Sequence, residues 1–120
     1  MPDRPRSVDR LLPLKPKVLH ILLALADGPR HGYAIMQEVA ARTDGQVRLW
    51  PAAMYGTLRE LEDLDLIAES ETRPDDDDER RRYFGLTPLG ARVLSAEVRR
   101  LEGIVDQARA SRALRKAARA

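Results

Sequence analysis

Three consecutive arginines, Arg80, Arg81 and Arg82, stand directly after a run of five acids at residues 75–79. A guanidinium group presents a planar fork of N–H donors, which can hold either a carboxylate or a phosphate by two hydrogen bonds. The arginines could therefore neutralise the neighbouring acids in a plain surface loop, or at least one of them could bind a phosphate. We favour phosphate binding, because a protein that holds a polyanion at this place needs cations there.

A second group of residues, at 51–59, combines small side chains with one tyrosine and one arginine. Apolar residues at helical spacing predict that one face of this segment is buried: Met54, Leu58, Leu61 and Leu64. The outward positions near its start are then Ala52, Ala53, Tyr55, Gly56 and Arg59. Small side chains let a helix come close to a partner, and an alanine methyl group can contact the methyl group of thymine. The Tyr55 hydroxyl could donate to a phosphate or a base, or the ring could pack against the preceding helix.

Lys15 and His31 stand near the expected starts of two helices, where backbone N–H groups attract phosphate. His31 could also serve only as the cap of its helix. His20 lies inside an apolar segment and is expected in the core or at an interface. Because the chain has two histidines and no cysteine, a zinc site would need carboxylates from distant segments, so we expect no metal and no other cofactor.

The charge balance and the motifs exclude several classes of protein. With 21 Lys and Arg against 19 Asp and Glu, the net charge is only +2. The net charge alone therefore does not indicate nucleic-acid binding, and only a local cluster of positive charge could do so. The chain has no glycine-rich phosphate loop and no nucleophile elbow, and an exposed acidic loop cannot tune a catalytic pKa, so we expect no enzyme. The longest apolar run, 21–26, is far shorter than a membrane span, which predicts a cytoplasmic protein without a membrane partner.

The elements that must position these side chains can be read from apolar spacing and from breaker residues. We expect helices at 15–26, from 31 to about 43, and from Pro51 onward. Two short strands, at 68–73 and 80–87, form a β-hairpin, and residues 46–50 form a small strand or an extended loop. Thr87 caps a last helix that runs from 89 to about 110.

The last helix carries a heptad pattern of apolar residues spaced four, three, four and three apart: Leu94, Val98, Leu101, Val105 and Ala108. A seam of this kind is how one helix buries itself against another. We therefore expect a homodimer that pairs through this helix. The tail that follows is basic, with Arg112, Arg115, Lys116 and Arg119 and no acid among them.

Three helices, a hairpin and a long helix predict a mainly α fold with a β-hairpin, a winged helix-turn-helix plus a long C-terminal helix. In that arrangement the third helix enters the major groove of DNA and the hairpin, or wing, lies beside it. The expected organisation is a flexible arm at 1–13, the winged helix-turn-helix domain at 14–88, and a dimerisation helix with its basic tail at 89–120.

Several segments together resemble the PadR family of bacterial transcriptional regulators. They are LLALADG at 22–28, HGYAI at 31–35, PAAMYGTL at 51–58, LE at 61–62, LI at 66–67 and RRYFGLTPLG at 81–90. The resemblance implies a DNA-binding regulator, with repression as the usual action, whose short forms pair through one C-terminal helix. It also implies the possibility of a small-molecule effector, of a kind that the sequence does not identify.

The chain departs from the family pattern at two places. The family has glycine before the 66–67 pair, as a left-handed helix cap, where this chain has Asp65. Aspartate tolerates that conformation better than most residues, so we expect the cap to persist. The five acids at 75–79 should repel phosphate, so we expect the tip of the wing to stay off the DNA.

The single tryptophan, Trp50, directly precedes the third helix. The simpler interpretation is that its large ring anchors the turn between the second and third helices. The alternative is that Trp50 lines an effector pocket near the dimer interface.

Two functional hypotheses follow. The first is a homodimeric repressor that binds a near-palindromic double-stranded site, with its recognition helices about 34 Å apart. The second is a winged-helix protein-interaction module that does not bind DNA. The small net charge and the acidic wing tip favour the second, while the arginine cluster, the basic ends and the regulator motif favour the first.

Overall fold

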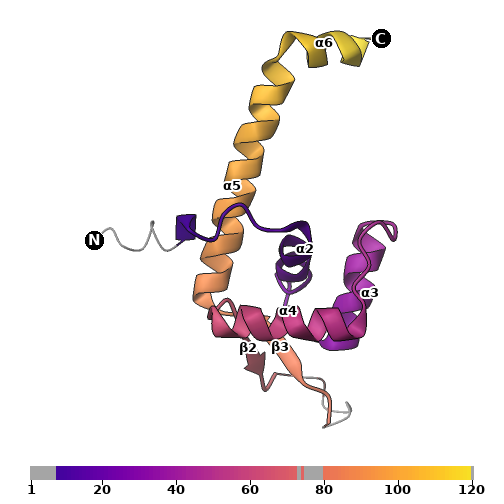
Figure 1. Ribbon diagram of the computed structural model, residues 1–120, viewed down its shortest axis with the longest axis vertical. Helices are drawn as coiled ribbons and strands as arrows, with labels where there is room; N and C mark the ends of the chain where they lie inside the picture. Colours follow the sequence, from indigo (N-terminus) through magenta and orange to yellow (C-terminus); the bar gives the residue numbers. More distant parts are fainter. Residues whose placement is uncertain (1–7, 73, 75–79, 120) are drawn as a thin grey trace, which may run out of the picture.

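The computed structural model describes residues 8–72, 74 and 80–119. The chain forms α2 (Pro16–Ala24), β1 (Arg30–His31), α3 (Gly32–Arg42), α4 (Pro51–Asp63), β2 (Ile67–Ser70), β3 (Tyr83–Leu86), α5 (Pro88–Ala110) and α6 (Arg112–Arg119). The first three helices form a cluster above a small sheet, and α5 rises from this body to carry α6 at its far end (Figure 1). This confirms the predicted mainly helical winged helix-turn-helix with a long C-terminal helix.

The sheet has three strands in the order β1-β3-β2, and β3 pairs antiparallel with both neighbours. The predicted hairpin is confirmed as β2 and β3, but both strands are shorter than expected. β1 was not predicted, because two residues are too few to show an alternating pattern. Residues 46–50 form a loop without a strand. Residues 80–82 precede β3, so the three arginines are not part of the strand that the sequence predicts at 80–87.

α2 is the central helix of the body. Pro16 occupies its first turn, where the missing N–H costs nothing, and Ile21, Leu22 and Ala24 are fully buried. The other helices and the sheet close around it with the side chains Ile35, Val39, Met54, Leu58, Leu61, Leu66, Ile67, Phe84 and Val93. This single core fixes the orientation of α4 relative to the sheet.

α4 ends in the left-handed aspartate that the sequence predicts. Asp65 has a φ of 62°, its N–H donates to the Glu62 carbonyl at 2.9 Å, and the Leu66 N–H donates to the Leu61 carbonyl at 2.9 Å. These two bonds form the Schellman arrangement. The prediction that Leu64 is buried is wrong: it is 48% exposed, because the helix ends there and the turn directs Leu66 inward instead.

The start of α5 packs directly on the backbone after α4. Thr87 Oγ1 accepts from the Gly90 N–H at 2.9 Å and donates to the Asp65 carbonyl at 2.5 Å, and the Thr87 N–H donates to the Leu66 carbonyl at 3.1 Å. A side chain at Gly90 would collide with that same Leu66 carbonyl. The glycine of the TPLG segment therefore has a structural reason: it lets two backbones touch.

Gly90→Ala is expected to lower the free energy of unfolding by about 2 kcal/mol or more, because the obstructing atom belongs to the backbone and cannot move aside. Gly103→Ala is the matched control on the same helix, since a methyl group there meets no atom within 4 Å. The control should gain up to about 1 kcal/mol from better helix propensity. Urea denaturation measures both, and equal stability of the two variants would contradict this account.

The described part of the N-terminal segment is not a free arm, which corrects the prediction for residues 8–13. Val8 is buried, and Leu11 and Leu12 pack against the core. The carboxylate of Glu97, which is 1% exposed, accepts from the Leu14 N–H at 3.0 Å and from Arg100 Nε at 2.6 Å. The Arg100 guanidinium, and then the Leu14 amide, lower the pKa of Glu97 below its usual value.

Glu97→Gln is expected to lower Tm at pH 7 by about 5 °C, because the ionised carboxylate is the form that Arg100 and Leu14 hold. Since the folded pKa is depressed, this stabilisation is complete above the pKa of the unfolded chain and is lost as pH falls through the folded pKa. The difference in Tm between wild type and variant should therefore shrink below about pH 4. Glu102→Gln, at an exposed position of the same helix, should show no such pH-dependent difference.

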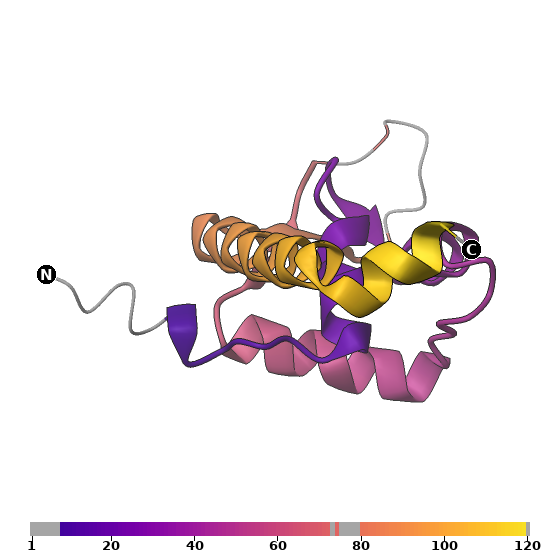
Figure 2. The ribbon, with the colours of Figure 1, turned by 90° about the horizontal axis from the view of Figure 1, so that it is seen from above.

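α5 is buried only in its first half, at Gly90, Val93, Leu94 and Glu97. Beyond these residues it leaves the body, and α6 turns away from its axis (Figure 2). Leu94, which the sequence places in the dimer seam, is 7% exposed within this chain and belongs to its core. Among the described residues, no helix has the length and apolar character to cross a membrane.

Candidate nucleic-acid interface

The outward surface of α4 carries the five residues that the sequence places there. Ala52, Ala53, Gly56 and Arg59 are exposed, and Tyr55 is 49% exposed, while Met54, Thr57, Leu58 and Leu61 turn inward. The Thr57 hydroxyl donates to the Ala53 carbonyl at 3.1 Å, so it needs no other partner. At Ala52, Ala53 and Gly56, the exposed surface of α4 therefore has at most a methyl group over the helix backbone.

Gly56 has no explanation in the packing of the chain itself. A methyl group there would meet no other atom within 4 Å. Glycine inside a helix costs up to about 1 kcal/mol relative to alanine. A glycine that the fold does not need, on an exposed helix, is consistent with the close approach of another molecule to the backbone.

Tyr55 joins α4 to the first turn of α3. Its hydroxyl and ring lie so close to Gly32 that the glycine has no room for a side chain. The packing alternative for Tyr55 is therefore observed, although nearly half of its surface remains exposed. Gly32 follows His31, so this contact places the outward face of α4 next to the base of the sheet.

His31 caps α3, as the sequence allowed, and contacts the wing. Its Nδ1 accepts from the Ala34 N–H at 3.2 Å, so a neutral His31 carries its proton on Nε2. Nη1 of Arg81 lies 3.3 Å from that Nε2, and the imidazole stands edge-on to the Tyr83 ring at 5.3 Å between centroids. His31 and Arg81 thus bring two N–H groups together beside the start of α3.

Arg82 is neutralised within the chain. Its Nη2 lies 3.1 Å from Glu69 Oε2 and 3.7 Å from Glu62 Oε2, and its guanidinium lies 5.1 Å from the centroid of Phe84. The hydrogen bond to Glu69 raises the pKa of Arg82 further. The self-neutralising interpretation therefore holds for Arg82, but with acids of β2 and α4. The run at 75–79, and with it the prediction for the wing tip, lies outside the described residues.

The other predicted cations are divided between two places. Arg80 and Arg81 are exposed just before β3, and Arg59 is exposed on α4. Lys15 is also exposed, but it directly follows Leu14, whose amide is bound to Glu97 of α5. The structure therefore groups Arg80 and Arg81 with His31 at the base of the wing and places Lys15 beside α5.

Trp50 does not anchor the turn before α4, so the simpler interpretation is wrong. It is the cap residue of α4 and is 68% exposed, while the preceding Leu49 is 7% exposed. The extended backbone sends alternate side chains to opposite sides, so Leu49 fills the core position and Trp50 faces outward. This register could not be read from so short a loop.

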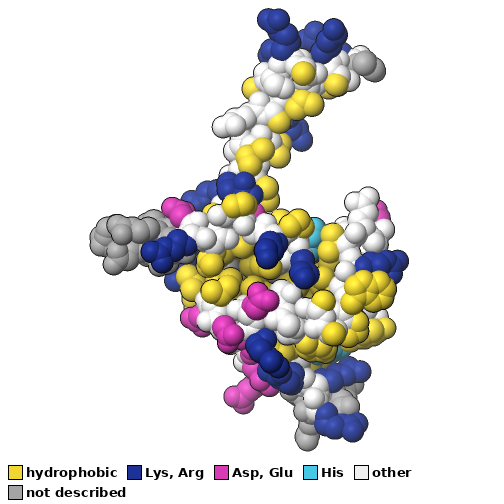
Figure 3. All heavy atoms as spheres, viewed as in Figure 1, with side chains coloured by type: hydrophobic (Ala, Val, Ile, Leu, Met, Phe, Trp, Pro, Cys, Tyr) yellow, Lys and Arg dark blue, Asp and Glu magenta, His cyan; other side chains and the backbone are white. Residues whose placement is uncertain are grey.

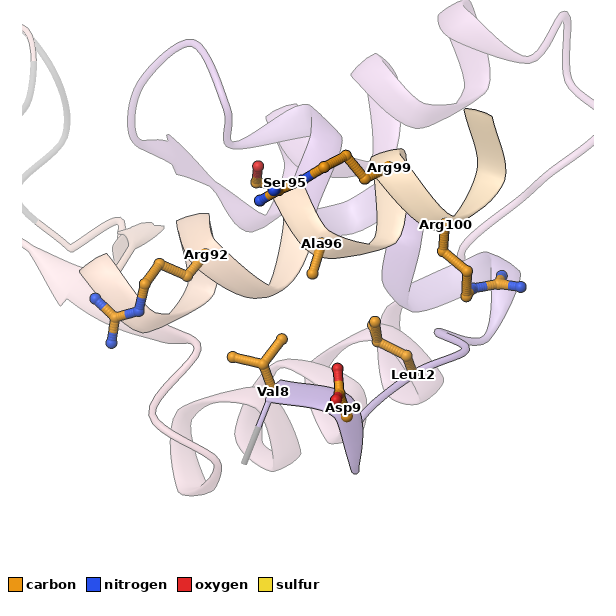
Figure 4. Close-up of a pocket in the computed structure, with 8 residues that line it drawn as sticks. All are labelled: Val8, Asp9, Leu12, Arg92, Ser95, Ala96, Arg99 and Arg100. Carbon is orange, nitrogen blue, oxygen red and sulfur yellow. The ribbon is translucent and has the colours of Figure 1, made fainter. Parts of the chain in front are cut away.

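A groove that the sequence did not predict lies between the N-terminal turn and α5 (Figure 4). Val8, Leu12 and Ala96 form its apolar part, and Trp50 does not line it. The guanidinium groups of Arg92 and Arg100 point to opposite ends of the groove in Figure 4, and Arg100 is bound to Glu97. Among residues 8–72, 74 and 80–119, no three potential metal ligands come together.

Only part of the predicted dimer seam on α5 is exposed on the surface of the chain. Val98 and Val105 are 38% and 45% exposed, and Leu101 and Ala108 are half-buried. Ile104, which the heptad pattern did not include, adds an apolar side chain that is 48% exposed. Hydrophobic side chains accordingly line the part of α5 that stands clear of the body (Figure 3).

The fold and this surface define a small winged helix-turn-helix protein. The chain belongs to the PadR-like family of transcriptional regulators, whose family model matches residues 21–96. The members of this family are transcriptional regulators and not enzymes.

Two uncharacterised proteins are similar to this chain in sequence. An uncharacterised 37.1 kDa protein of a Streptomyces fradiae transposon is 43% identical over 77 residues, which is 64% of this chain. The chain spans only 20% of the length of that relative. An uncharacterised protein of Lysinibacillus sphaericus is 32% identical over 79 residues, which is 66% of this chain and 72% of that protein.

Solved structures show the same fold. A PadR family transcription regulator of Clostridium difficile matches with a TM-score of 0.59 at 24% identity, over 76% of this chain and 95% of its own. Bacillus subtilis PadR in complex with operator DNA matches with a TM-score of 0.59 at 22% identity, over 72% of this chain and 48% of its own. The chain is thus a transcriptional regulator by its family, and it shares its fold with these solved structures.

Proposed function

We propose that this protein is a homodimeric repressor that binds a near-palindromic site on double-stranded DNA in the cytoplasm. The proposal rests mainly on the structure at the start of α4. There, exposed residues with little or no side chain lie next to the base of the wing. The resemblance to Bacillus subtilis PadR, whose structure contains operator DNA, supports the same role.

α4 is suited to the major groove, which admits one helix whose side chains read the base edges. Ala52, Ala53 and Gly56 allow the backbone to come close, and the alanine methyl groups can contact thymine. Tyr55 and Arg59 supply donors on the same surface. In this arrangement α4 reads the sequence.

The phosphate backbone would be held at the base of the wing. The Nε2–H of His31 and Nη1 of Arg81, 3.3 Å apart, can share one phosphate oxygen, and the first turn of α3 adds backbone N–H groups nearby. Arg80 stands one residue away, and Lys15 would meet a phosphate only farther along the duplex. Arg82 takes a structural part, because Glu69 and Glu62 already neutralise it.

The dimer would form through the free part of α5, along Val98, Leu101, Val105 and Ala108. Leu94 lies at the end of this seam and supports it from the core. Pairing across the seam would set two α4 helices about 34 Å apart, one turn of DNA. The exposed Trp50 remains a candidate contact for a small-molecule effector, whose identity nothing on this surface defines.

Titration against duplex DNA from upstream of the protein's own gene, and against the same DNA scrambled, tests the proposal at two salt concentrations. We expect tight binding to the upstream duplex, and affinity for both duplexes should fall steeply with salt. Arg81→Gln should reduce the salt slope by about one for each subunit that binds. Absent or salt-insensitive binding would contradict the proposal and favour a module that binds only protein.

A further inference from the structure

α6 separates its side chains by charge. At 100° per residue, the four cations fall within an arc of about 100°, and the opposite side holds only small or apolar residues. The cations are Arg112, Arg115, Lys116 and Arg119, and together they line one shallow surface. Figure 3 shows them as a dark blue cap at the end of the molecule. We call this surface the α6 basic face.

The α6 basic face has no counterions within the described part of the chain. The last acid before it is Asp106, and no carboxylate forms a salt bridge with its cations among residues 8–72, 74 and 80–119. Like charges three and four residues apart destabilise a helix by a few tenths of a kcal/mol for each pair. Arg112 also places a positive charge at a helix N-terminus, where the helix dipole opposes it. Such a cluster is a cost to the isolated helix that an external polyanion would remove.

The orientation of this face is built into the chain. Ser111 ends α5 in an extended conformation, and its hydroxyl then caps α6 by accepting from the Leu114 N–H at 3.3 Å. The Arg115 N–H donates to the Ser111 carbonyl at 3.1 Å. α6 therefore turns away from the axis of α5, at the opposite end of the molecule from the wing (Figures 1 and 2).

The chemistry of α6 favours nucleic acid over a lipid surface. A helix that lies in a membrane interface needs a broad face of large apolar side chains. The face opposite the cations offers one leucine, Leu114, and three alanines. A row of arginines and one lysine about 10 Å long instead matches the closely spaced phosphates of a DNA strand.

We propose that the α6 basic face binds the phosphates of duplex DNA outside the site that α4 reads, without sequence preference. This proposal rests on DNA binding by the protein, but on different residues from those that read the site. Because α6 lies at the opposite end of the molecule from the wing, the phosphates that it binds belong to a second DNA segment, and the sequence recognised by α4 is unchanged.

The test holds an immobilised 20-bp duplex that contains only the recognised site, saturates it with protein, and adds a labelled 60-bp duplex of random sequence. Wild type should retain the second duplex at low salt and release it as salt rises, since phosphate contacts give a salt-dependent affinity. The variant R112Q/R115Q/K116Q/R119Q should bind the 20-bp duplex like wild type but retain the second duplex at least about tenfold more weakly. A variant that retains the second duplex like wild type would overturn the proposal, as would a wild type that does not retain it.

Three controls separate the alternatives. R92Q/R99Q removes two exposed cations from α5 and should retain more of the second duplex than R112Q/R115Q, which removes two from α6. Binding of vesicles of anionic phosphatidylglycerol that depends on α6, together with capture of the second duplex that does not depend on α6, would assign the face to lipid and overturn the proposal. If the 20-bp duplex is not bound specifically, the proposed function fails, while binding of random 60-bp DNA that depends on α6 would still support this inference.

Discussion

Val105→Glu is expected to convert the protein from a dimer to a monomer and to weaken its binding to the recognised duplex by about 100-fold or more. Val105 is 45% exposed on the free part of α5, well beyond the residues that pack on the body. In a two-fold dimer each substitution places a charge in the seam twice, without a partner. A monomer reaches only one half-site and loses the gain that comes from linking two.

Gln107→Glu is the matched control for this substitution. It adds the same charged group two residues away on the same exposed helix, where the side chain points about 160° from Val105. Sedimentation velocity should show a dimer for the control and a monomer for Val105→Glu, with the same helix content in both. If the Val105→Glu variant is a dimer with wild-type affinity, α5 does not form the dimer interface.

Ala53→Glu is expected to weaken the affinity for the recognised duplex by about 100-fold or more, while the stability of the fold is unchanged. Counting from the cap residue Trp50, Ala53 is the third residue of α4, where a glutamate interacts favourably with the helix dipole. The substitution therefore should not destabilise the protein. It does bring a negative charge, and a longer side chain, to the surface that must approach the phosphates and bases.

Ala91→Glu provides the comparison, since it makes the same change in the first turn of α5, at another exposed alanine. Fluorescence anisotropy with labelled duplex should give wild-type affinity for Ala91→Glu and no saturable binding for Ala53→Glu. Similar affinities for the two variants would show that α4 does not approach the DNA.

The sequence is most informative where one residue type determines one backbone conformation. Thr87 and Pro88 mark the start of α5, and Asp65 adopts the left-handed conformation that the family gives to glycine. The outward residues of α4 follow from helical spacing alone. These features are local, so a single segment suffices to predict them.

Features that depend on distant contacts could not be predicted in this way. β1 exists because Arg30 and His31 meet Phe84 and Tyr83, more than 50 residues later. The carboxylate of Glu97 is stable in the core because the Leu14 N–H, from a distant part of the chain, and the Arg100 guanidinium, from the next turn of the helix, donate to it. The sequence could not show which of the three arginines is neutralised within the chain, because Glu62 and Glu69 come beside Arg82 only in the folded protein.

The central claim is that two copies of α4 read two half-sites related by a two-fold axis. Selection of bound duplexes from a random pool by the wild-type protein tests it most directly. The account predicts enrichment of an inverted repeat whose half-site centres lie about 10 bp apart, one helical turn. Enrichment of a single unpaired half-site, or of no sequence at all, would contradict it.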